Sequence, residues 1–441
     1  MAAKTARDCV LSMLSRVFSE EVFLRDIFEE ETAALSGRDR AFAEKLALGV
    51  LEKKTSLDAV IAQVSTTPLK KLKPKILRIL EIGGYELLFL SKASYAPVNE
   101  AVSLTKRSGL AGLSGFVNAV LRRISREGQE IFNALDPWQK LGIPETLKNL
   151  LIQWYGDEKA LSVTEAMCRE DTRMVIRRCK RFCTEQEFTE TLEKDGVQPV
   201  KTGLTADTYY ADGESPVFLT EGFKRGFFYI QDLSSCMAAE AVSDLMPERI
   251  LDVCSAPGGK LLQILDGLSD YTEAVACDLT EKRTKLIREN LARLPYPNVQ
   301  VRESDAAGFN PEFENRFDLV IADLPCSGLG TLHKNPELRY RTTEKSLWEI
   351  QALQKPILDT VCRYVQPKGT LLYSTCTLNP AENSLQISEF LRNHPEFTLT
   401  AFMENLPECL KSREAGTGQI QILPDEFPGS GFYIARLYRK P

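Results

Sequence analysis

Apolar residues in the first third of the chain recur at the spacing of amphipathic helices. From Val10 to Phe18 they stand at positions i, i+4, i+7 and i+8, which places them on one helix face. Because no strand-like alternation interrupts this pattern, we expect residues 1–140 to form an all-helical domain. The same period predicts further helices over 39–53, 73–91, 96–107 and 114–126, the last with Ser114 as its N-cap.

Residues 145–240 carry a mixed pattern. A helical period opens the segment, and the runs MVIRRCKRF, GVQPVKTGL and GFFYIQDL then have the length and composition of short strands. A further helix is predicted between these strands at 184–195. We therefore expect a small mixed α/β subdomain in this part of the chain.

Residues 241–441 alternate apolar strands with helices. The strand-length runs are RILDVCS, EAVACDL, VQVRESD, FDLVIADLP and GTLLYSTCT, and the helical segments are 260–268, 281–292, 345–364 and 380–393. Strands that are apolar on both faces are typical of parallel sheets covered by helices, so we expect a Rossmann-like, doubly wound α/β domain. The late runs FTLTAF, GQIQILP and GFYIARL predict an antiparallel edge.

Composition narrows the class of protein. The 441 residues are 43% hydrophobic and 26% charged, which is ordinary for a globular protein. No apolar run is long enough to span a bilayer, and Arg7, Asp8 and Arg16 within the first apolar stretch predict that it is no secretory signal. Eleven cysteines without a CxxC pair, and only two histidines (His333 and His394), disfavour a disulfide scaffold and a zinc site. We expect a cytoplasmic protein with reduced thiols and no metal.

The net charge of −6 hides an uneven distribution of charge. Residues 1–150 carry a net +4 and the remainder a net −10. A local basic surface can bind phosphates whatever the total charge, although solvated helix faces look the same in sequence. His333 is interpreted as a surface loop residue. The candidate phosphate contacts are Lys70, Lys71, Lys73, Lys75 and Arg78, then Arg122, Arg123 and Arg126 at the end of a helix, and then Lys334, Arg339 and Arg341.

The predicted strand ends carry residues suited to a nucleoside. Ligands of doubly wound sheets bind beyond the carboxyl ends of the strands. Glycines in the first turn let a ligand approach backbone amides, and an acid after the second strand can bind both ribose hydroxyls. Neither G-x-G-x-x-G nor a P-loop occurs, so S-adenosylmethionine, which has no phosphate, fits best. The residues at these ends are Cys254, Ser255, Ala256, Pro257, Gly258, Gly259 and Lys260, with Asp278 for the ribose, Asp305 for the adenine edge, and Asp323.

Cys326 and Cys376 fall at the same edge of the sheet, after the fourth and fifth strands, and we expect them to be neighbours in space. A thiolate that adds to C6 of cytosine makes C5 nucleophilic towards a methyl donor, and a second group must then remove the C5 hydrogen. A carboxylic acid near N3 would neutralise the charge that builds there. Cys376, Cys326 and Asp323 supply these three roles, although no histidine lies near to activate a thiol. Other cysteines are interpreted as buried hydrophobes, namely Cys236, Cys277 and Cys362.

The motifs LDVCSAPGGK, DLPCSGLG, LYSTCTLNPAENS and GFYIARL, preceded by GFFYIQDLSS, resemble those of the NOL1/NOP2/Sun family of RNA cytosine-C5 methyltransferases. The helical part, through RAFAEKLALGVL, YAPVNEAVSL and GFVNAVLRRI, is similar to the RNA-binding fold of the antitermination factor NusB. This resemblance implies that Cys376 is the nucleophile and that Cys326 assists product release. It also implies that residues 254–260, Asp278, Asp305 and Asp323 bind S-adenosylmethionine, with Lys260 also able to reach the substrate.

The pairing of the two parts is similar to a bacterial branch of that family that methylates one cytosine of 16S rRNA, at position 967. The implied partner is 16S rRNA, naked or in an early assembly particle, and we expect a monomer with no membrane partner. The sequence departs from the family at Arg177-Arg-Cys179, where Arg-x-Asn is frequent, and at Asn335-Pro-Glu337, where His-Pro-Asp is frequent.

Three alternatives stay open at this point. The first is C5 methylation of another RNA cytosine, in tRNA or 23S rRNA. The second is a DNA cytosine-C5 methyltransferase with Cys326 as the nucleophile, against which Thr375-Cys376 argues. The third is a non-catalytic RNA-binding or antitermination factor that keeps a vestigial cofactor fold.

Overall fold

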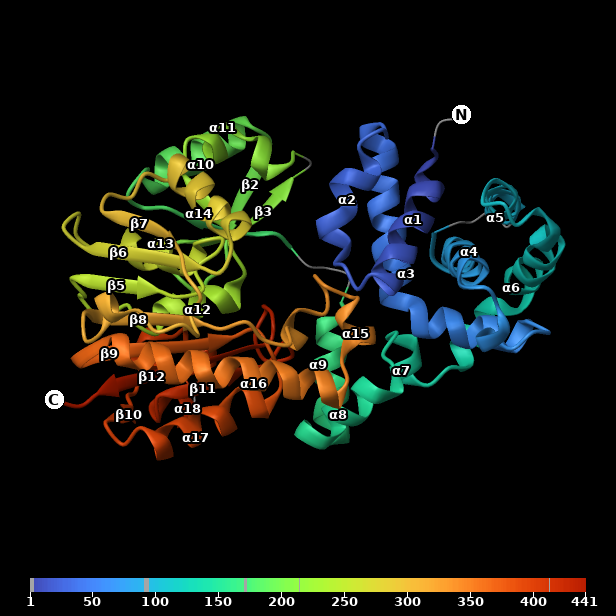
Figure 1. Ribbon diagram of the computed structural model, residues 1–441. Coiled ribbons are helices and arrows are strands. Elements are labelled where there is room, and N and C mark those ends of the chain that lie inside the picture. Colours follow the sequence, from blue (N-terminus) through green and yellow to red (C-terminus); the bar gives the residue numbers. More distant parts are fainter. Residues whose placement is uncertain (1–3, 91–94, 170–172, 214, 412) are drawn as a thin grey trace. The chain divides into compact units, whose positions relative to one another are not determined.

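The computed structural model describes residues 4–90, 95–169, 173–213, 215–411 and 413–441, and these divide into two compact units (Figure 1). Unit 1 comprises Met1–Cys168 and Leu332–Thr343. Unit 2 comprises Arg169–Thr331 and Glu344–Pro441. The chain therefore leaves unit 2 for twelve residues in the middle of its C-terminal half.

Unit 1 is helical. Its apolar faces share one buried core, in which Val10, Leu14 and Val17 of the first helix take part, as their spacing predicts. Thr5 and Asp8 form a capping box that starts this helix. The helices are α1 (Ala6–Ser19), α2 (Leu24–Thr32), α3 (Gly37–Val64), α4 (Pro74–Tyr85), α5 (Tyr95–Arg107), α6 (Ser114–Ala134), α7 (Pro137–Lys140), α8 (Glu145–Tyr155), α9 (Asp157–Met167) and α15 (Leu338–Arg341).

The predicted helices of this part are present, with different ends. Helix α3 runs well beyond 39–53, and α4 continues as a π-helix over Glu86–Leu90, while position 91 lies outside the described residues. The prediction that Ser114 is an N-cap is wrong, because a 3-10 turn over Ala111–Leu113 leads into α6 and Leu113 takes the cap position. The Ser114 hydroxyl instead donates to the Ala111 carbonyl at 2.7 Å.

Unit 2 begins with a small antiparallel sheet of order β2-β3-β1-β4. Helix α10 (Glu185–Lys194) packs Phe188 and Leu192 into the core of this sheet and starts at a capping box made by Thr184 and Glu187. The predicted strands and helix are confirmed, and β3 is added to them. The strands are β1 (Val175–Arg178), β2 (Val197–Lys201), β3 (Thr208–Gly213) and β4 (Phe228–Ile230), with the short helix α11 (Glu221–Lys224).

The second sheet of unit 2 has the order β10-β12-β9-β8-β5-β6-β7, with β11 paired to β12. Strands β5 to β9 pair in parallel, and β12 joins β9, β10 and β11 in antiparallel fashion, so both predicted features are confirmed. The strands are β5 (Arg249–Asp252), β6 (Glu273–Asp278), β7 (Val299–Glu303), β8 (Phe317–Asp323), β9 (Val365–Thr375), β10 (Phe397–Leu399), β11 (Gln419–Ile422) and β12 (Phe432–Arg439).

Helices cover both faces of this sheet. Ile250 of β5 belongs to the apolar cluster under α12, α13 and α14, whereas the next residue, Leu251, belongs to the cluster under α16 and α17. Successive side chains of a strand point to opposite faces, which is why a strand between two helical layers is apolar at every position. The helices are α12 (Leu233–Glu240), α13 (Gly259–Asp266), α14 (Glu281–Arg293), α16 (Glu344–Val361), α17 (Ser384–Asn393) and α18 (Arg413–Gly416).

Among the described residues, no helix has the length and apolar character needed to cross a bilayer. The division into domains 1–140, 145–240 and 241–441 stays a prediction.

Candidate active site

The two candidate cysteines meet at the carboxyl end of the sheet. Asp323, the last residue of β8, pairs in register with Ser374 of β9, so the loops that follow these strands start side by side. The Cys326 and Cys376 sulfur atoms are 3.3 Å apart, within hydrogen-bond distance, and both cysteines are free and partly exposed. Their predicted proximity is confirmed. Cys236, Cys277 and Cys362 are buried, also as predicted.

The two thiols differ in the direction in which their pKa values are shifted. A hydrogen bond from Cys326 lowers the pKa of Cys376, opposed by burial and by the charge of Asp323 and aided by the charge of Lys260. The pKa of Cys326 is raised well above its usual range by its hydrogen bond to Cys376, by burial and by nearby negative charges. A thiolate is the reactive form of cysteine, so the arrangement favours Cys376 as the nucleophile and Cys326 as the thiol that donates to it.

Lys260 supplies a positive charge that favours the thiolate form of Cys376, in the absence of a histidine near it in the sequence. It lies in the first turn of α13, and its Nζ donates to Oδ2 of Asp323 at 2.6 Å. The Ser374 hydroxyl donates to the other carboxylate oxygen at 2.7 Å. Burial alone would lower the pKa of Lys260, but the charge and hydrogen bond of Asp323 raise it, so the ammonium stays charged.

The turn between β5 and α13 depends on its two glycines. Gly258 caps α13 with a φ of 108°, a conformation that favours glycine, and a Cβ on Gly259 would lie 3.1 Å from the Tyr229 ring. Beside this turn, Oδ1 of Asp252 and Oγ of Ser255 are buried without a hydrogen-bond partner. Buried oxygens without a partner beside a glycine turn fit an adenosyl ligand with a charged amino-acid end.

Asp252 is a site residue that sequence reasoning missed, because it reads as part of an apolar strand. Its side chain is only 2% exposed, and burial, the largest influence, raises its pKa to about 7. The charge of Asp323 acts in the same direction, while Lys260 opposes it. An acid that ends an otherwise apolar strand segment was the available signal.

Asp278 is tied to the same turn. Its carboxylate accepts from the amides of Ala256 and Leu279, both at 2.9 Å, and from Nε of Arg283 at 2.6 Å. Arg283, which the sequence did not single out, also donates to the Ala256 carbonyl at 3.2 Å and so joins the first two strand ends. Asp305 is exposed after β7, where it accepts from the Ala307 amide at 2.9 Å. The order β8-β5-β6-β7 places the predicted acids in a row along one edge.

Several predicted phosphate contacts are wrong, because their side chains hold unit 1 together. Arg339 is 3% exposed and donates to the carbonyls of Glu52 and Leu141 at 2.6 and 3.1 Å. Arg341 donates to two carbonyls of unit 1 at the α1–α2 connection. Arg78 is buried beside Glu81 at 2.8 Å.

The remaining basic residues of unit 1 differ in exposure. Arg122 and Arg126 are exposed, whereas Arg123 is half-buried and donates to the Val64 carbonyl at 2.6 Å. These arginines do not end their helix, since α6 continues to Ala134. His333 lies in the predicted loop and is half-buried, and Lys334 is exposed. The four lysines of the first group are all exposed, namely Lys70, Lys71, Lys73 and Lys75.

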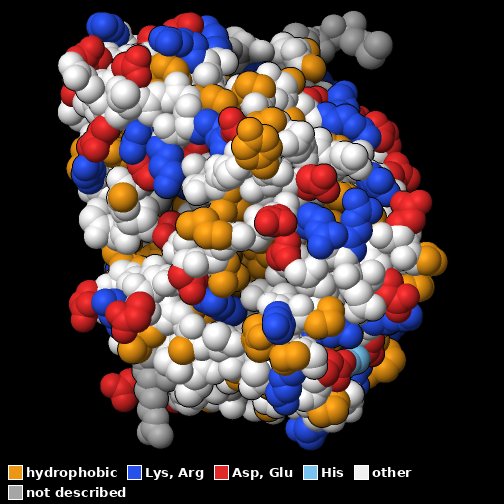
Figure 2. All heavy atoms as spheres, turned by 90° about the vertical axis from the view of Figure 1, so that its left-hand side faces the viewer, with side chains coloured by type: hydrophobic (Ala, Val, Ile, Leu, Met, Phe, Trp, Pro, Cys, Tyr) orange, Lys and Arg blue, Asp and Glu red, His pale blue; other side chains and the backbone are white. Residues whose placement is uncertain are grey.

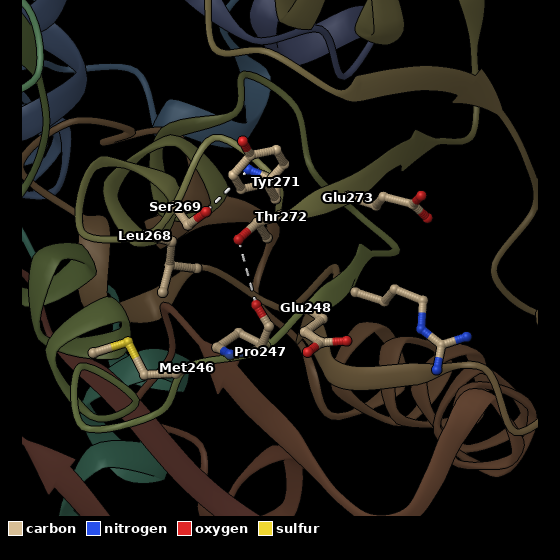
Figure 3. A pocket seen from close by; sticks show the side chains of 9 residues that line it. Met246, Pro247, Glu248, Leu268, Ser269, Tyr271, Thr272 and Glu273 are labelled. Carbon is tan, nitrogen blue, oxygen red and sulfur yellow. Dashed lines mark hydrogen bonds between the residues drawn. The ribbon is translucent and has the colours of Figure 1, made fainter.

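A pocket of about 540 Å³ lies at the opposite, amino-terminal edge of β5 and β6 (Figure 3). It is lined by residues 246–249, 268–269 and 271–273, and Thr272 donates there to the Pro247 carbonyl at 3.5 Å. No residue from the carboxyl ends of the strands lines this pocket, so it is separate from the cysteine pair.

Figure 2 shows Lys and Arg mixed with Asp and Glu over the face that it views.

Comparison with known proteins agrees with this architecture. A family model described as 16S rRNA methyltransferase RsmB/F matches residues 242–438, and one for the NusB family matches residues 4–126. The chain is 32% identical to the probable ribosomal RNA small subunit methyltransferase B of Synechocystis sp., over 91% of this chain and 92% of that one. It is 29% identical to the protein of the same name from Bacillus subtilis, over the full length of both.

Two crystal structures are similar to the whole fold or to a part of it. The structure of PH0851 has a TM-score of 0.78 at 23% identity and covers 99% of both chains. A methyltransferase homolog from Pyrococcus horikoshii has a TM-score of 0.58 at 26% identity and covers 69% of this chain and 98% of its own. The helical unit and the sheet therefore recur together in a solved protein.

Proposed function

Because the chain belongs to the RsmB/F family of 16S rRNA methyltransferases, we propose that it methylates C5 of a cytosine in 16S rRNA through a covalent adduct with Cys376. The protein is an S-adenosylmethionine-dependent methyltransferase. The observation that carries the finer proposal is the pair of sulfur atoms 3.3 Å apart, next to the Lys260–Asp323 ion pair. Methylation of an exocyclic amine needs no nucleophilic thiol, whereas methylation at C5 of cytosine needs a thiolate to add to C6 first.

The residues present fit the cofactor. The glycines of segment 254–260 would let its amino-acid end approach the backbone, and the buried Asp252 Oδ1, which has no hydrogen-bond partner, is an acceptor for an ammonium group. Asp278 would accept from the ribose hydroxyls, and Asp305 would meet the adenine edge. When bound, the cofactor supplies an electrophilic methyl group.

In the proposed reaction, the Cys376 thiolate adds to C6 of the cytosine, and the electron pair displaced from the C5–C6 double bond becomes available at C5. The Lys260 ammonium, held in place by the Asp323 carboxylate, stabilises the negative charge that develops towards N3. C5 then takes the methyl group, which leaves a neutral adduct that carries both a hydrogen and a methyl at C5.

The adduct itself prepares the second thiol. The hydrogen bond to Cys376 and its negative charge both raise the pKa of Cys326, and both disappear once Cys376 is bonded to carbon. Cys326 can then lose its proton to solvent and accept the proton from C5. The C5–H electron pair re-forms the double bond, the C6–S bond breaks, and Cys376 returns as a thiolate with one proton released overall.

We infer that RNA is bound by exposed basic residues, because the buried arginines of segment 332–343 and Arg78 are committed to the fold. The lysine patch, defined as Lys70, Lys71, Lys73 and Lys75, lies in the part of the chain that matches the NusB family. By similarity, position 967 is the proposed target. Bisulfite sequencing of total RNA from cells that lack the protein tests this, since loss of 5-methylcytosine in tRNA or 23S rRNA instead would reassign the substrate.

Trapping with substrate RNA tests which cysteine is the nucleophile. With S-adenosylmethionine present, Cys326→Ala should accumulate a covalent protein–RNA adduct that survives denaturing electrophoresis, and Cys376→Ala should form none. The opposite result would make Cys326 the nucleophile, as in DNA cytosine-C5 methyltransferases. Absence of methylation by the wild-type protein would favour a non-catalytic RNA-binding role.

A further inference from the structure

A turn outside the described reaction connects the two cysteine loops. Residues Pro380–Glu382 form a 3-10 turn between β9 and α17, and Glu382 and Asn383 at its end are both buried. Asn383 donates to the Thr377 carbonyl at 3.0 Å and accepts from the Thr375 hydroxyl at 2.6 Å. These are the two residues that flank Cys376 in the chain.

Glu382 reaches across to the other cysteine loop. Its two oxygens accept from the amide of Ser327 at 2.8 Å and from the hydroxyl of Ser327 at 2.5 Å. Ser327 is the residue immediately after Cys326. The carboxylate also accepts from the amides of Asn379 at 2.9 Å and Gln354 at 3.2 Å, and Gln354 donates to the Pro325 carbonyl at 2.9 Å.

Glu382 is fully buried at the end of this turn. A buried carboxylate is costly unless it is hydrogen-bonded, and here all four partners are donors that belong to, or support, the loops of the two thiols. The hydroxyl of Ser327 lies 2.6 Å from that of Thr377, so the loops are also joined directly. Burial raises the pKa of Glu382, while these hydrogen bonds oppose that effect.

We propose that Glu382 is a positioning residue that holds the Cys326 loop so that its sulfur can reach C5 of the adduct formed by Cys376. This inference rests on the proposed function. Glu382 holds the Cys326 loop through Ser327, and its charge also raises the pKa of Cys326. Its role belongs to the release step, because attack by Cys376 depends on Lys260 and on the strand end that Asn383 supports.

The test is Glu382→Gln, which keeps the size of the side chain but replaces one acceptor oxygen with a donor that faces other donors. We expect turnover to fall by about 100-fold, the scale of a misplacement of about 1 Å of a reacting group. Ordinary cytosine RNA should then accumulate a covalent adduct in the presence of S-adenosylmethionine, as expected for Cys326→Ala. The affinity for S-adenosylmethionine should stay that of the wild type.

Glu389→Gln is the matched control, since Glu389 lies on α17 and forms an exposed ion pair with Lys355. It should behave as wild type. If Glu382→Gln turns over normally, or loses turnover and binds cofactor normally without accumulating adduct, the positioning role is wrong.

A second variant covers loss of folding. If Glu382→Gln no longer binds cofactor, Ser327→Ala removes only the hydroxyl contact and should still slow release by about tenfold with visible adduct. Lack of adduct in Ser327→Ala would overturn the inference. Lack of adduct in Cys326→Ala, with no methylation by wild type, would instead overturn the proposed function.

Discussion

Lys260→Met should make Cys376 less reactive at neutral pH. Lys260 lowers the pKa of Cys376, whereas Asp323, 2.6 Å from its ammonium, raises it. Removing the lysine therefore removes a favourable charge and leaves the unfavourable one uncompensated. Since a thiolate is favoured above its pKa, a raised pKa means less thiolate at a given pH.

The exposure of the pair sets the size of the effect. Two unit charges about 4 Å apart interact by about 4 kcal/mol at an effective dielectric constant of about 20, and by about 1 kcal/mol in water. The Lys260 side chain is 12% exposed and that of Asp323 30%, which places the site between these limits. An effect of about 1.4–3 kcal/mol corresponds to about 10- to 100-fold less thiolate at pH 7.

The assay is the rate of iodoacetamide alkylation at Cys376 against pH, followed by mass spectrometry of the Cys376 peptide without RNA or cofactor. Exposed Cys409 is an internal reference. Lys345→Met is a matched control, because the Lys345 side chain is 83% exposed.

Lys260 and Asp323 shift the pKa of Cys376 in opposite directions, so their variants should change the alkylation rate in opposite directions. Asp323→Asn should speed alkylation at neutral pH, and the double variant Lys260→Met/Asp323→Asn should lie close to wild type. If both single variants slow the reaction, or if neither changes it, the ion pair does not control the thiolate.

Three further predictions concern other parts of the chain. Arg339→Ala should lower the free energy of unfolding by about 2–4 kcal/mol in urea titrations, because two partly buried carbonyls lose their donor. The control is Arg25→Ala, at a side chain that is 69% exposed, which should change the free energy of unfolding by less than about 0.5 kcal/mol. Equal effects of the two variants would contradict a structural role for Arg339. Replacing all four lysines of the lysine patch with alanine should weaken RNA binding and flatten its salt dependence, and an unchanged slope would make the patch a solvated face. Burial raises the pKa of Asp252 to about 7 from 3.8, so the free energy of unfolding should fall progressively as pH rises from about 4 to 7. Asp252→Asn should remove that fall. Parallel curves of stability against pH for the two proteins would refute this prediction.

Much of the fold could be predicted from the sequence because the signals are local. Residues such as Ile250 and Leu251 are both apolar since each faces a different helical layer, and this is visible as a continuous apolar run. The acids and cysteines of the site stand at strand ends, and parallel strands bring their carboxyl ends to one edge. The helix ends were less accurate, as at Ser114, because capping depends on the turn that precedes it.

Charge and burial could not be predicted in the same way. Arg78, Arg339 and Arg341 look in sequence like surface cations, but each has a partner that is distant along the chain. Arg78 lies over the Phe18 ring, Arg339 donates to the Glu52 carbonyl, and Arg341 donates to the Val22 carbonyl. Asp252 looks like one more strand residue, yet its oxygen is orphaned beside the glycine turn. Whether a polar group is desolvated depends on neighbours that the local pattern does not contain.

The sequence by itself therefore determined the order of helices and strands, the edge of the sheet where chemistry can occur, and the presence there of two thiols and a carboxylate. Only the tertiary structure brings the two sulfur atoms to 3.3 Å and Lys260 beside Asp323, and our proposal that Cys376 is the nucleophile rests on this arrangement. It also decided that Glu382 reaches the loop of Cys326 from a different segment. Periodicity is set by residues near in sequence, whereas pKa values and loop positions are set by groups that only folding brings within a few ångströms.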